Sequence, residues 1–288
     1  MSPARRPPVC LTIAGSDSGG GAGVQADLKA FAACGAHGAS ALTALTAQST
    51  VAVTGVHAVP PAFIVEQVRA VVDDLGVDAV KLGMLGDVVT IAAVAEALDL
   101  VPADVPVVLD PVMVAESGAR LLDRDAVRAL VERLLPRATV VTPNLPEARV
   151  LAGAGAPTDG AGGRTGARPP AAEAVEALAR AIHGLGPHAV VVTGGHRDHA
   201  VDLLFDGTST TEIAGPRHAD GAAHGSGCTL ASALAAHLAH GFSLHEAAFA
   251  ARAIAGEAVR RGLREIGAGA GPVDVLGVVD RTPLRHRT

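Results

Sequence analysis

One segment of the chain combines an anion-binding pattern with a chemically reactive side chain. Gly225, Ser226 and Gly227 lead directly into Cys228 and then into a Thr/Ala/Leu-rich stretch that predicts a helix. Backbone N–H groups at such a turn and at a helix N-terminus point toward one place, which suits a phosphate group. The same positive potential favours the thiolate of Cys228. We predict that this segment, Gly225–Cys228, is a catalytic anion turn.

A second glycine-rich segment, Gly15–Asp27, follows the first predicted strand and opens the first predicted helix. Three of its residues fit the dinucleotide fingerprint G-x-G-x-x-A, namely Gly21, Gly23 and Ala26. That fingerprint needs an acidic residue about 20 positions further on. The next predicted strand leads instead to Gln48, with no acid nearby, which argues against a Rossmann oxidoreductase. A P-loop is excluded because no Gly-Lys-Ser/Thr follows. The segment either serves packing or places Asp17 and Asp27 beside a ligand.

Polar residues follow two further predicted strands. Asp110 comes directly after one strand, and Asn144 and Glu147 come after the next. Such groups can hold Mg²⁺, largely through water, around phosphate oxygens. Asn144 can equally cap a helix, with Glu147 completing a capping box. Together with the anion turn, these two strand ends favour a metal and phosphate site.

The elements that position these residues are apolar strands alternating with helical patterns. The predicted strands are Val9–Ala14, Ala39–Ala47, Val51–Val59, Ala79–Leu82, Val105–Leu109, Thr139–Thr142, Ala189–Thr193, Ala200–Phe205 and Thr210–Ile213. The predicted helices are Val24–Cys34, Ala62–Leu75, Val88–Leu98, Asp123–Leu135, Leu145–Ala152, Ala171–Leu185, Thr229–Ala239 and Leu244–Arg261. Continuous apolar strands are typical of a sheet that is covered on both faces. We predict an α/β fold with a mostly parallel sheet, whose strand carboxyl ends bind ligands.

Composition excludes several classes of protein. The chain has 288 residues, of which 49% are hydrophobic, and we expect a single domain over residues 1–288. Its core spans about residues 9–264, and Gly153–Pro170 is expected to be a surface insertion.

A net charge of -6, without a basic stripe or any Trp or Tyr, argues against a nucleic-acid partner. There is no apolar run long enough for a membrane span. Three cysteines without metal-ligand spacing fit a reduced, cytoplasmic setting.

Several segments together resemble the hydroxymethylpyrimidine/phosphomethylpyrimidine kinases of the ribokinase-like superfamily. The resemblance runs from about Val9 to Arg264 and covers nearly the whole chain. Each segment alone is weak evidence, but their order and spacing are specific. They are Thr12–Asp17 with Gly20–Lys29, Thr43–Gln48, Lys81–Leu85, Asp110–Met113, Thr142–Glu147, Gly194–His196 and His224–Thr229.

The resemblance implies that ATP phosphorylates 4-amino-5-hydroxymethyl-2-methylpyrimidine and then its monophosphate, for thiamine diphosphate synthesis. It places the pyrimidine pocket at Gly15, Asp27, Gln48, Met84 and Val112. Gln48 offers a donor and an acceptor to the aminopyrimidine, and Asp27 can accept from its amino or hydroxymethyl group. Met84 and Val112 can hold the ring between them, although a core role for Met84 stays open.

For the second substrate, the resemblance implies ATP contacts at Asn144, Thr193 and Gly195, and Mg²⁺ at Asp110 and Glu147. Superfamily relatives carry an Asp base where this chain has Cys228, so the thiolate is expected to take the hydroxymethyl proton. Many family members carry a Lys where this chain has Thr193. We therefore expect Mg²⁺ and the anion turn to stabilise the negative charge of the phosphate groups.

Two other functions remain open. Pyridoxal also presents a hydroxymethyl group on an aromatic ring, so a pyridoxal kinase is the nearest rival, although Gln48 and Met84 favour the pyrimidine. A catalytically idle pyrimidine-binding regulator is supported by the missing Lys alone. The resemblance also implies a homodimer.

Overall fold

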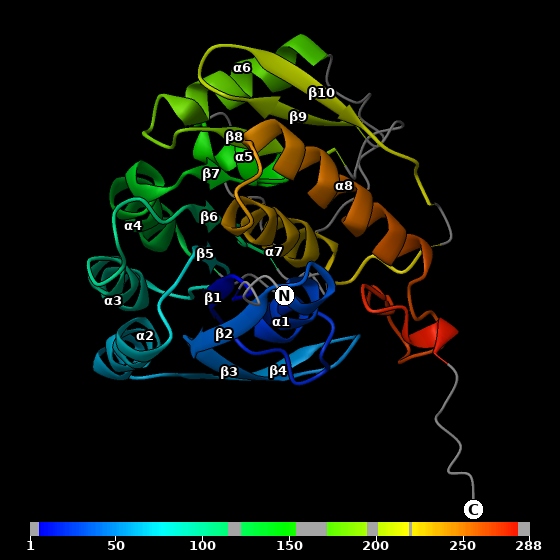
Figure 1. Ribbon diagram of the computed structural model, residues 1–288, viewed down its shortest axis with the longest axis horizontal. Coiled ribbons are helices and arrows are strands. Elements are labelled where there is room, and N and C mark those ends of the chain that lie inside the picture. Colours follow the sequence, from blue (N-terminus) through cyan, green and yellow to red (C-terminus); the bar gives the residue numbers. More distant parts are fainter. Residues whose placement is uncertain (1–5, 115–121, 154–171, 195–200, 219–220, 282–288) are drawn as a thin grey trace, which may run out of the picture.

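The computed structural model describes residues 6–114, 122–153, 172–194, 201–218 and 221–281. Within these residues, eight strands form the main sheet in the order β10-β9-β8-β7-β6-β5-β1-β2 (Figure 1). The strands from β2 to β8 in this order run parallel, whereas β9 is antiparallel to β8 and β10 to β9. Their bounds are β1 Val9–Ala14, β2 His37–Leu42, β5 Ala79–Leu82, β6 Val107–Leu109, β7 Val140–Val141, β8 Val190–Val192, β9 Val201–Phe205 and β10 Thr210–Ala214. The predicted mostly parallel sheet is confirmed.

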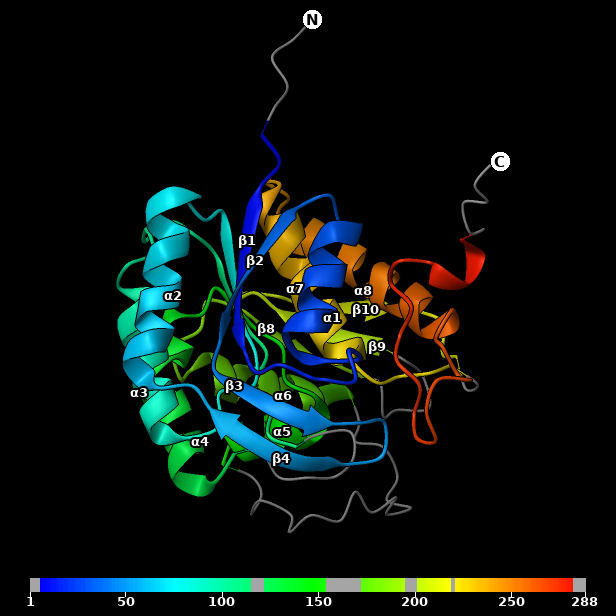
Figure 2. The ribbon, with the colours of Figure 1, turned by 90° about the horizontal axis from the view of Figure 1, so that it is seen from below.

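Helices cover both faces of this sheet (Figure 2). One face carries α2 Pro61–Asp74, α3 Val88–Leu98, α4 Arg124–Arg133, α5 Leu145–Leu151 and α6 Ala172–His183. The other face carries α1 Gly23–Ala33, α7 Ser226–Ala239 and α8 Leu244–Arg260. Short 3₁₀ turns occupy Leu135–Arg137 and Val278–Asp280. None of the described helices combines the length and apolar character needed to cross a bilayer.

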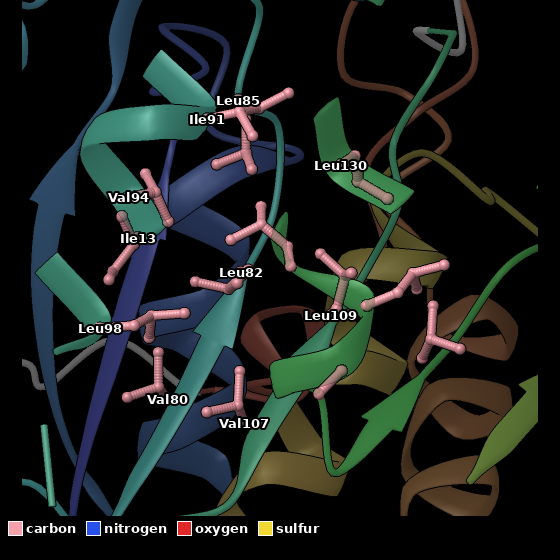
Figure 3. Close-up of a cluster of buried hydrophobic side chains, with 14 of the residues drawn as sticks. Ile13, Val80, Leu82, Leu85, Ile91, Val94, Leu98, Val107, Leu109 and Leu130 are labelled. Carbon is pink, nitrogen blue, oxygen red and sulfur yellow. The ribbon is translucent and has the colours of Figure 1, made fainter. Parts of the chain in front are cut away.

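The apolar strands divide their side chains between two cores. Leu109 of β6 packs toward α3 and α4, whereas its neighbour Val108 packs toward α7. Successive residues of a strand point to opposite faces, so a sheet covered twice needs apolar residues at both. Figure 3 shows the first core, with Leu82 and Leu109 from the sheet facing Ile91 and Leu130 from the helices.

The predicted strand Ala39–Ala47 is wrong, because the chain turns away from the main sheet at Thr43. The amide of Thr43 donates to Ala14 (3.0 Å), and its hydroxyl donates to the carbonyl of Met84 (2.8 Å). Beyond it, β3 (Ala44–Gln48) pairs antiparallel with β4 (Val53–Ala58). This hairpin lies beside the carboxyl ends of the parallel strands (Figure 2).

Elsewhere, the observed bounds differ from the predicted ones by a residue or two, with one functional exception. Helix α7 begins at Ser226 rather than Thr229, so the anion turn is part of its first turn. The predicted insertion Gly153–Pro170 lies almost entirely outside the described residues.

Candidate active site

The carboxyl ends of β1, β5, β6, β7 and β8 open into a cavity of about 460 Å³. Its lining includes twelve of the predicted site residues, namely Gly15, Gln48, Met84, Asp110, Val112, Asn144, Glu147, Thr193, Gly225, Ser226, Gly227 and Cys228. Of the other two, Asp27 does not line it and Gly195 lies outside the described residues. The topology thus brings together polar strand ends that lie far apart in sequence.

The anion turn depends on a backbone conformation that only glycine adopts easily. Gly225 has a φ of 85° and forms the N-cap of α7. A Cβ at this position would collide with the carbonyl oxygen of Gly21. The anion turn therefore packs directly on the glycine-rich loop, residues 15–23, and presents the N-terminus of α7 to the cavity.

A fully buried cation, Lys81 on β5, lies beneath this turn. Its Nζ is 2.9 Å from Oδ1 of Asp27 and 3.8 Å from Oδ2 of Asp110. Burial opposes the charge on Lys81, but these carboxylates outweigh burial and raise the pKa of the amine above its usual value. Lys81 therefore keeps its positive charge without solvent.

Asp27, expected to contact the substrate, lies behind the cavity wall, where its carboxylate binds other residues of the protein. Besides Lys81, Oδ1 accepts from the Ser232 hydroxyl (2.8 Å) and Oδ2 accepts from the Thr12 hydroxyl (2.6 Å). The side chain is wholly buried. Since α1 carries Asp27 on its buried face, the residue anchors Lys81.

Cys228 also differs from the sequence expectation, because its thiol is neutral in the free protein. Burial raises the pKa to about 12, against the opposing charge of Lys81, and the carboxylates of Asp110 and Asp27 raise it further. The positive helix terminus predicted a thiolate, whereas two carboxylates nearby reverse that balance. The side chain itself is half-buried and lines the cavity.

Asp110 carries the chemical signature of a ligand site. Burial raises the pKa of its carboxyl group to about 6, in spite of the opposing effect of Lys81. Its Oδ2 is buried and has no hydrogen-bond partner among the described residues. A buried oxygen without a hydrogen bond raises the free energy of the folded state, so this atom fits a position where a cation or a water molecule binds.

Asn144 and Glu147 form a helix capping box and also line the cavity. Oδ1 of Asn144 accepts from the amide of Glu147 (2.9 Å), and Oε2 of Glu147 accepts from the amide of Asn144 (2.9 Å). The capping box is therefore real, yet both residues also line the cavity. Burial raises the pKa of Glu147 to about 8, with a further contribution from Asp110.

The opposite wall of the cavity is set by the glycine-rich loop and the hairpin. A Cβ on Gly15 would collide with the Met84 side chain, so the missing side chain makes room for this thioether. Gln48, at the end of β3, is held by its backbone to the Ser18 hydroxyl (2.8 Å in both directions). The side-chain Oε1 of Gln48 accepts a hydrogen bond from the Thr46 hydroxyl (3.2 Å). The side-chain nitrogen of Gln48 donates no hydrogen bond to any described residue.

Thr193 extends the sheet to the cavity edge, where its amide donates to Pro143 (2.9 Å) and it bridges to Asn144. The next residue, Gly194, donates its amide to Asp202 (2.7 Å). Asp202 in turn pairs with Arg252 of α8 (3.3 Å), and both line the cavity.

Sequence reasoning gave no role to Lys81 or to the pair formed by Asp202 and Arg252. A signal for Lys81 was present, since a lone charge within the apolar strand Ala79–Leu82 needs a buried partner. For Asp202 and Arg252, which lie on β9 and α8, neither spacing nor residue type indicates the contact.

The ion pair between Lys81 and Asp27 yields a stability prediction. Lys81→Met leaves the Asp27 carboxylate buried without its cation, which should lower the free energy of unfolding by about 3–5 kcal/mol. The double variant Lys81→Met/Asp27→Asn removes both charges and should regain most of this loss. Urea unfolding measures both, and a single variant as stable as the wild type would contradict the assignment.

Comparison with known proteins agrees with this geometry. The family model for phosphomethylpyrimidine kinase matches residues 17–274. A hydroxymethylpyrimidine/phosphomethylpyrimidine kinase of Rhizobium meliloti is 48% identical over 268 residues, which cover 92% of this chain and 96% of the relative. A bifunctional thiamine biosynthesis protein of Geobacter sulfurreducens is 47% identical over 266 residues, or 92% of this chain. The match spans only 51% of that longer relative.

Among solved structures, a pyridoxal kinase from Staphylococcus aureus in complex with ADP superposes with a TM-score of 0.83 and 34% identity. The match covers 96% of each chain and confirms the expected ribokinase-like fold. The chain therefore belongs to the phosphomethylpyrimidine kinase family.

Proposed function

We propose that the protein transfers a phosphoryl group from ATP to 4-amino-5-hydroxymethyl-2-methylpyrimidine and then to its monophosphate, for thiamine diphosphate synthesis. The observation that carries this proposal is the single cavity that joins Gln48 and Met84 on one wall to the anion turn on another. Family membership fixes the reaction class, and the cavity supplies a place for each reactant.

The acceptor is held by the wall formed from the glycine-rich loop and the hairpin. The amide of Gln48 can donate to a ring nitrogen and accept from the exocyclic amine, which gives the pyrimidine one orientation. Met84 and Val112 contact the ring faces, and the absence of a side chain on Gly15 gives Met84 its place in the wall. Asp27 supports this wall through its ion pair with Lys81.

The nucleotide occupies the part of the cavity near Asn144, Thr193 and Gly194, and Gly195 next to them is proposed as a further contact. Asp110 and Glu147 would hold Mg²⁺, directly or through water, and Oδ2 of Asp110, which accepts no hydrogen bond from the described residues, fits this role. When bound, the ion neutralises charge on the phosphate oxygens. Thr193 is uncharged, so the anion turn has to stabilise more of the negative charge on the phosphate oxygens.

Phosphoryl transfer forms a bond between the hydroxymethyl oxygen and the γ-phosphorus, while the bond to the ADP oxygen breaks. Gly225, Ser226 and Gly227 orient backbone N–H groups toward the transferred group. Cys228 receives the hydroxyl proton as the new bond forms. Because the free protein holds the thiol neutral, Cys228 first has to release its own proton to solvent water in the cavity, and the resulting thiolate then accepts the hydroxyl proton. A loose transition state demands little of its base, so positioning dominates the rate.

Three broader properties complete the proposal. The chain is a single kinase domain, supported by one sheet that includes strands from Val9 to Ala214. It acts in the cytoplasm, which its three free cysteines favour. It forms a homodimer through the β3–β4 hairpin, where Leu45, Val51 and Val56 expose 45%, 56% and 59% of their surface.

Product analysis tests the activity directly. Incubating the protein with the pyrimidine and MgATP should give the monophosphate and then the diphosphate, resolved by mass spectrometry. Pyridoxal, offered in parallel, should show a lower kcat/KM, because it lacks the exocyclic amine that Gln48 recognises. A preference for pyridoxal would support the rival kinase activity, whereas pyrimidine binding without ADP release would support an idle regulator.

The role of Cys228 is tested by two substitutions. Cys228→Ala should lower kcat by at least roughly 10²-fold, since it removes the proton acceptor. Cys228→Ser keeps a side chain of similar size without comparable acidity and should be impaired to a similar degree. Near-normal turnover in either variant, measured by ADP release at saturating MgATP, would overturn the assignment.

The homodimer is tested by size-exclusion chromatography with light scattering. The wild type should elute at twice the 28.6 kDa mass of one chain. Leu45→Lys/Val56→Lys places charges on the hairpin and should shift the protein to the monomer. A monomeric wild type, or a dimer unaffected by the double substitution, would contradict the proposed interface.

A further inference from the structure

The glycine-rich loop is organised by one buried carboxylate, Asp17. Its Oδ1 accepts from the amide of Gly19 (2.8 Å), and its Oδ2 accepts from the amides of Gly21 (3.0 Å) and Ala22 (2.8 Å). Only 2% of the residue is exposed. The carboxylate of Asp17 therefore accepts hydrogen bonds from three N–H groups of the loop, which would otherwise be free to bind an external anion.

The same carboxylate also contacts His224, the residue that precedes the anion turn. Nε2 of His224 lies 3.1 Å from Oδ2 of Asp17, and both side chains are buried. Burial opposes ionisation of Asp17, yet the bonds from His224, Ala22 and Gly19 outweigh it and lower the pKa of the carboxyl group. The carboxylate thus remains an acceptor for the imidazole N–H.

Packing between the two segments leaves no room for side chains. A Cβ on Gly21 would collide with the His224 ring, and a Cβ on Gly225 would collide with the carbonyl of Gly21. On its other side, the backbone of His224 is fixed by Gly271 (3.3 Å) and Val273 (3.1 Å). The imidazole is therefore held between a fixed backbone and the loop.

We propose that the hydrogen bond from His224 to Asp17 is a positioning device that sets the anion turn relative to the glycine-rich loop. The loop carries Gly15 beside the acceptor, and the turn carries Cys228 and the phosphate-binding N–H groups. The bond fixes the distance between the two halves of the reaction. This inference rests on the proposed function, because it assigns one reactant to each segment.

Two substitutions of His224 separate this role from general stability. The amide nitrogen of Gln reaches about as far as Nε2 of His, whereas that of Asn ends near Nδ1. His224→Gln should retain most of the activity, and His224→Asn should lower kcat by about 10²-fold with a smaller change in KM. Equal loss in both variants, or none in His224→Asn, would overturn the proposal.

A matched control lies at the other end of the same helix. His240 follows α7, about 21 Å from its first residue, and its Nε2 bonds to the carbonyl of Cys34 (2.9 Å). His240→Asn removes a comparable bond remote from the cavity and should leave kcat unchanged. A comparable loss of kcat in this variant would overturn the specific role of His224.

Hydrogen exchange tests the coupling without relying on turnover. In the full-length protein, Asp17→Asn should speed amide exchange at residues 19–22 and also in the neighbouring anion turn at residues 225–228. His224→Asn should produce the same pair of changes, and His224→Gln should produce neither. Faster exchange confined to the altered segment would overturn the coupling. Wild-type product analysis tests the reaction separately, so either proposal can fail alone.

Discussion

The ion pair between Lys81 and Asp27 is the interaction on which the site depends. A buried ammonium group requires a paired carboxylate. Asp27 on α1 supplies this carboxylate to Lys81 on β5, the neighbour of β1. Thr12 of β1 and Ser232 of α7 donate to the same carboxylate, so four elements meet at one charge. The positive charge then lies beside Asp110 and Cys228, where the reaction needs a fixed field in a water-poor setting.

This arrangement also explains the titration behaviour of the cavity. Asp110 and Glu147 lie within one buried, acidic region, and burial raises the pKa of both carboxyl groups. Such a region favours a divalent cation, which offsets the repulsion that the carboxylates otherwise share. The capping box and the proposed metal role of Glu147 are therefore compatible, because each carboxylate oxygen has more than one lone pair.

Much of the fold follows from the sequence, because continuous apolar runs indicate buried strands when helical patterns separate them, although the pattern does not reveal the turn at Thr43. The same logic places Asp110, Asn144 and Thr193 at one edge, since the parallel strands before them end there. The direction of a side chain does not follow from such patterns. Asp27 occupies the expected helix but faces inward toward Lys81, and the neutral thiol of Cys228 depends on carboxylates from other elements.

The turn at Thr43 has an evolutionary consequence. Because β3 and β4 form a separate ribbon, Gln48, which we propose recognises the acceptor, belongs to a part of the chain that does not build the anion turn. Substitutions in this ribbon can alter which small molecule is accepted while the buried charges and the helix terminus stay intact. A kinase of this architecture can therefore diverge in substrate by changing one peripheral module, and its chemistry can be inherited unchanged.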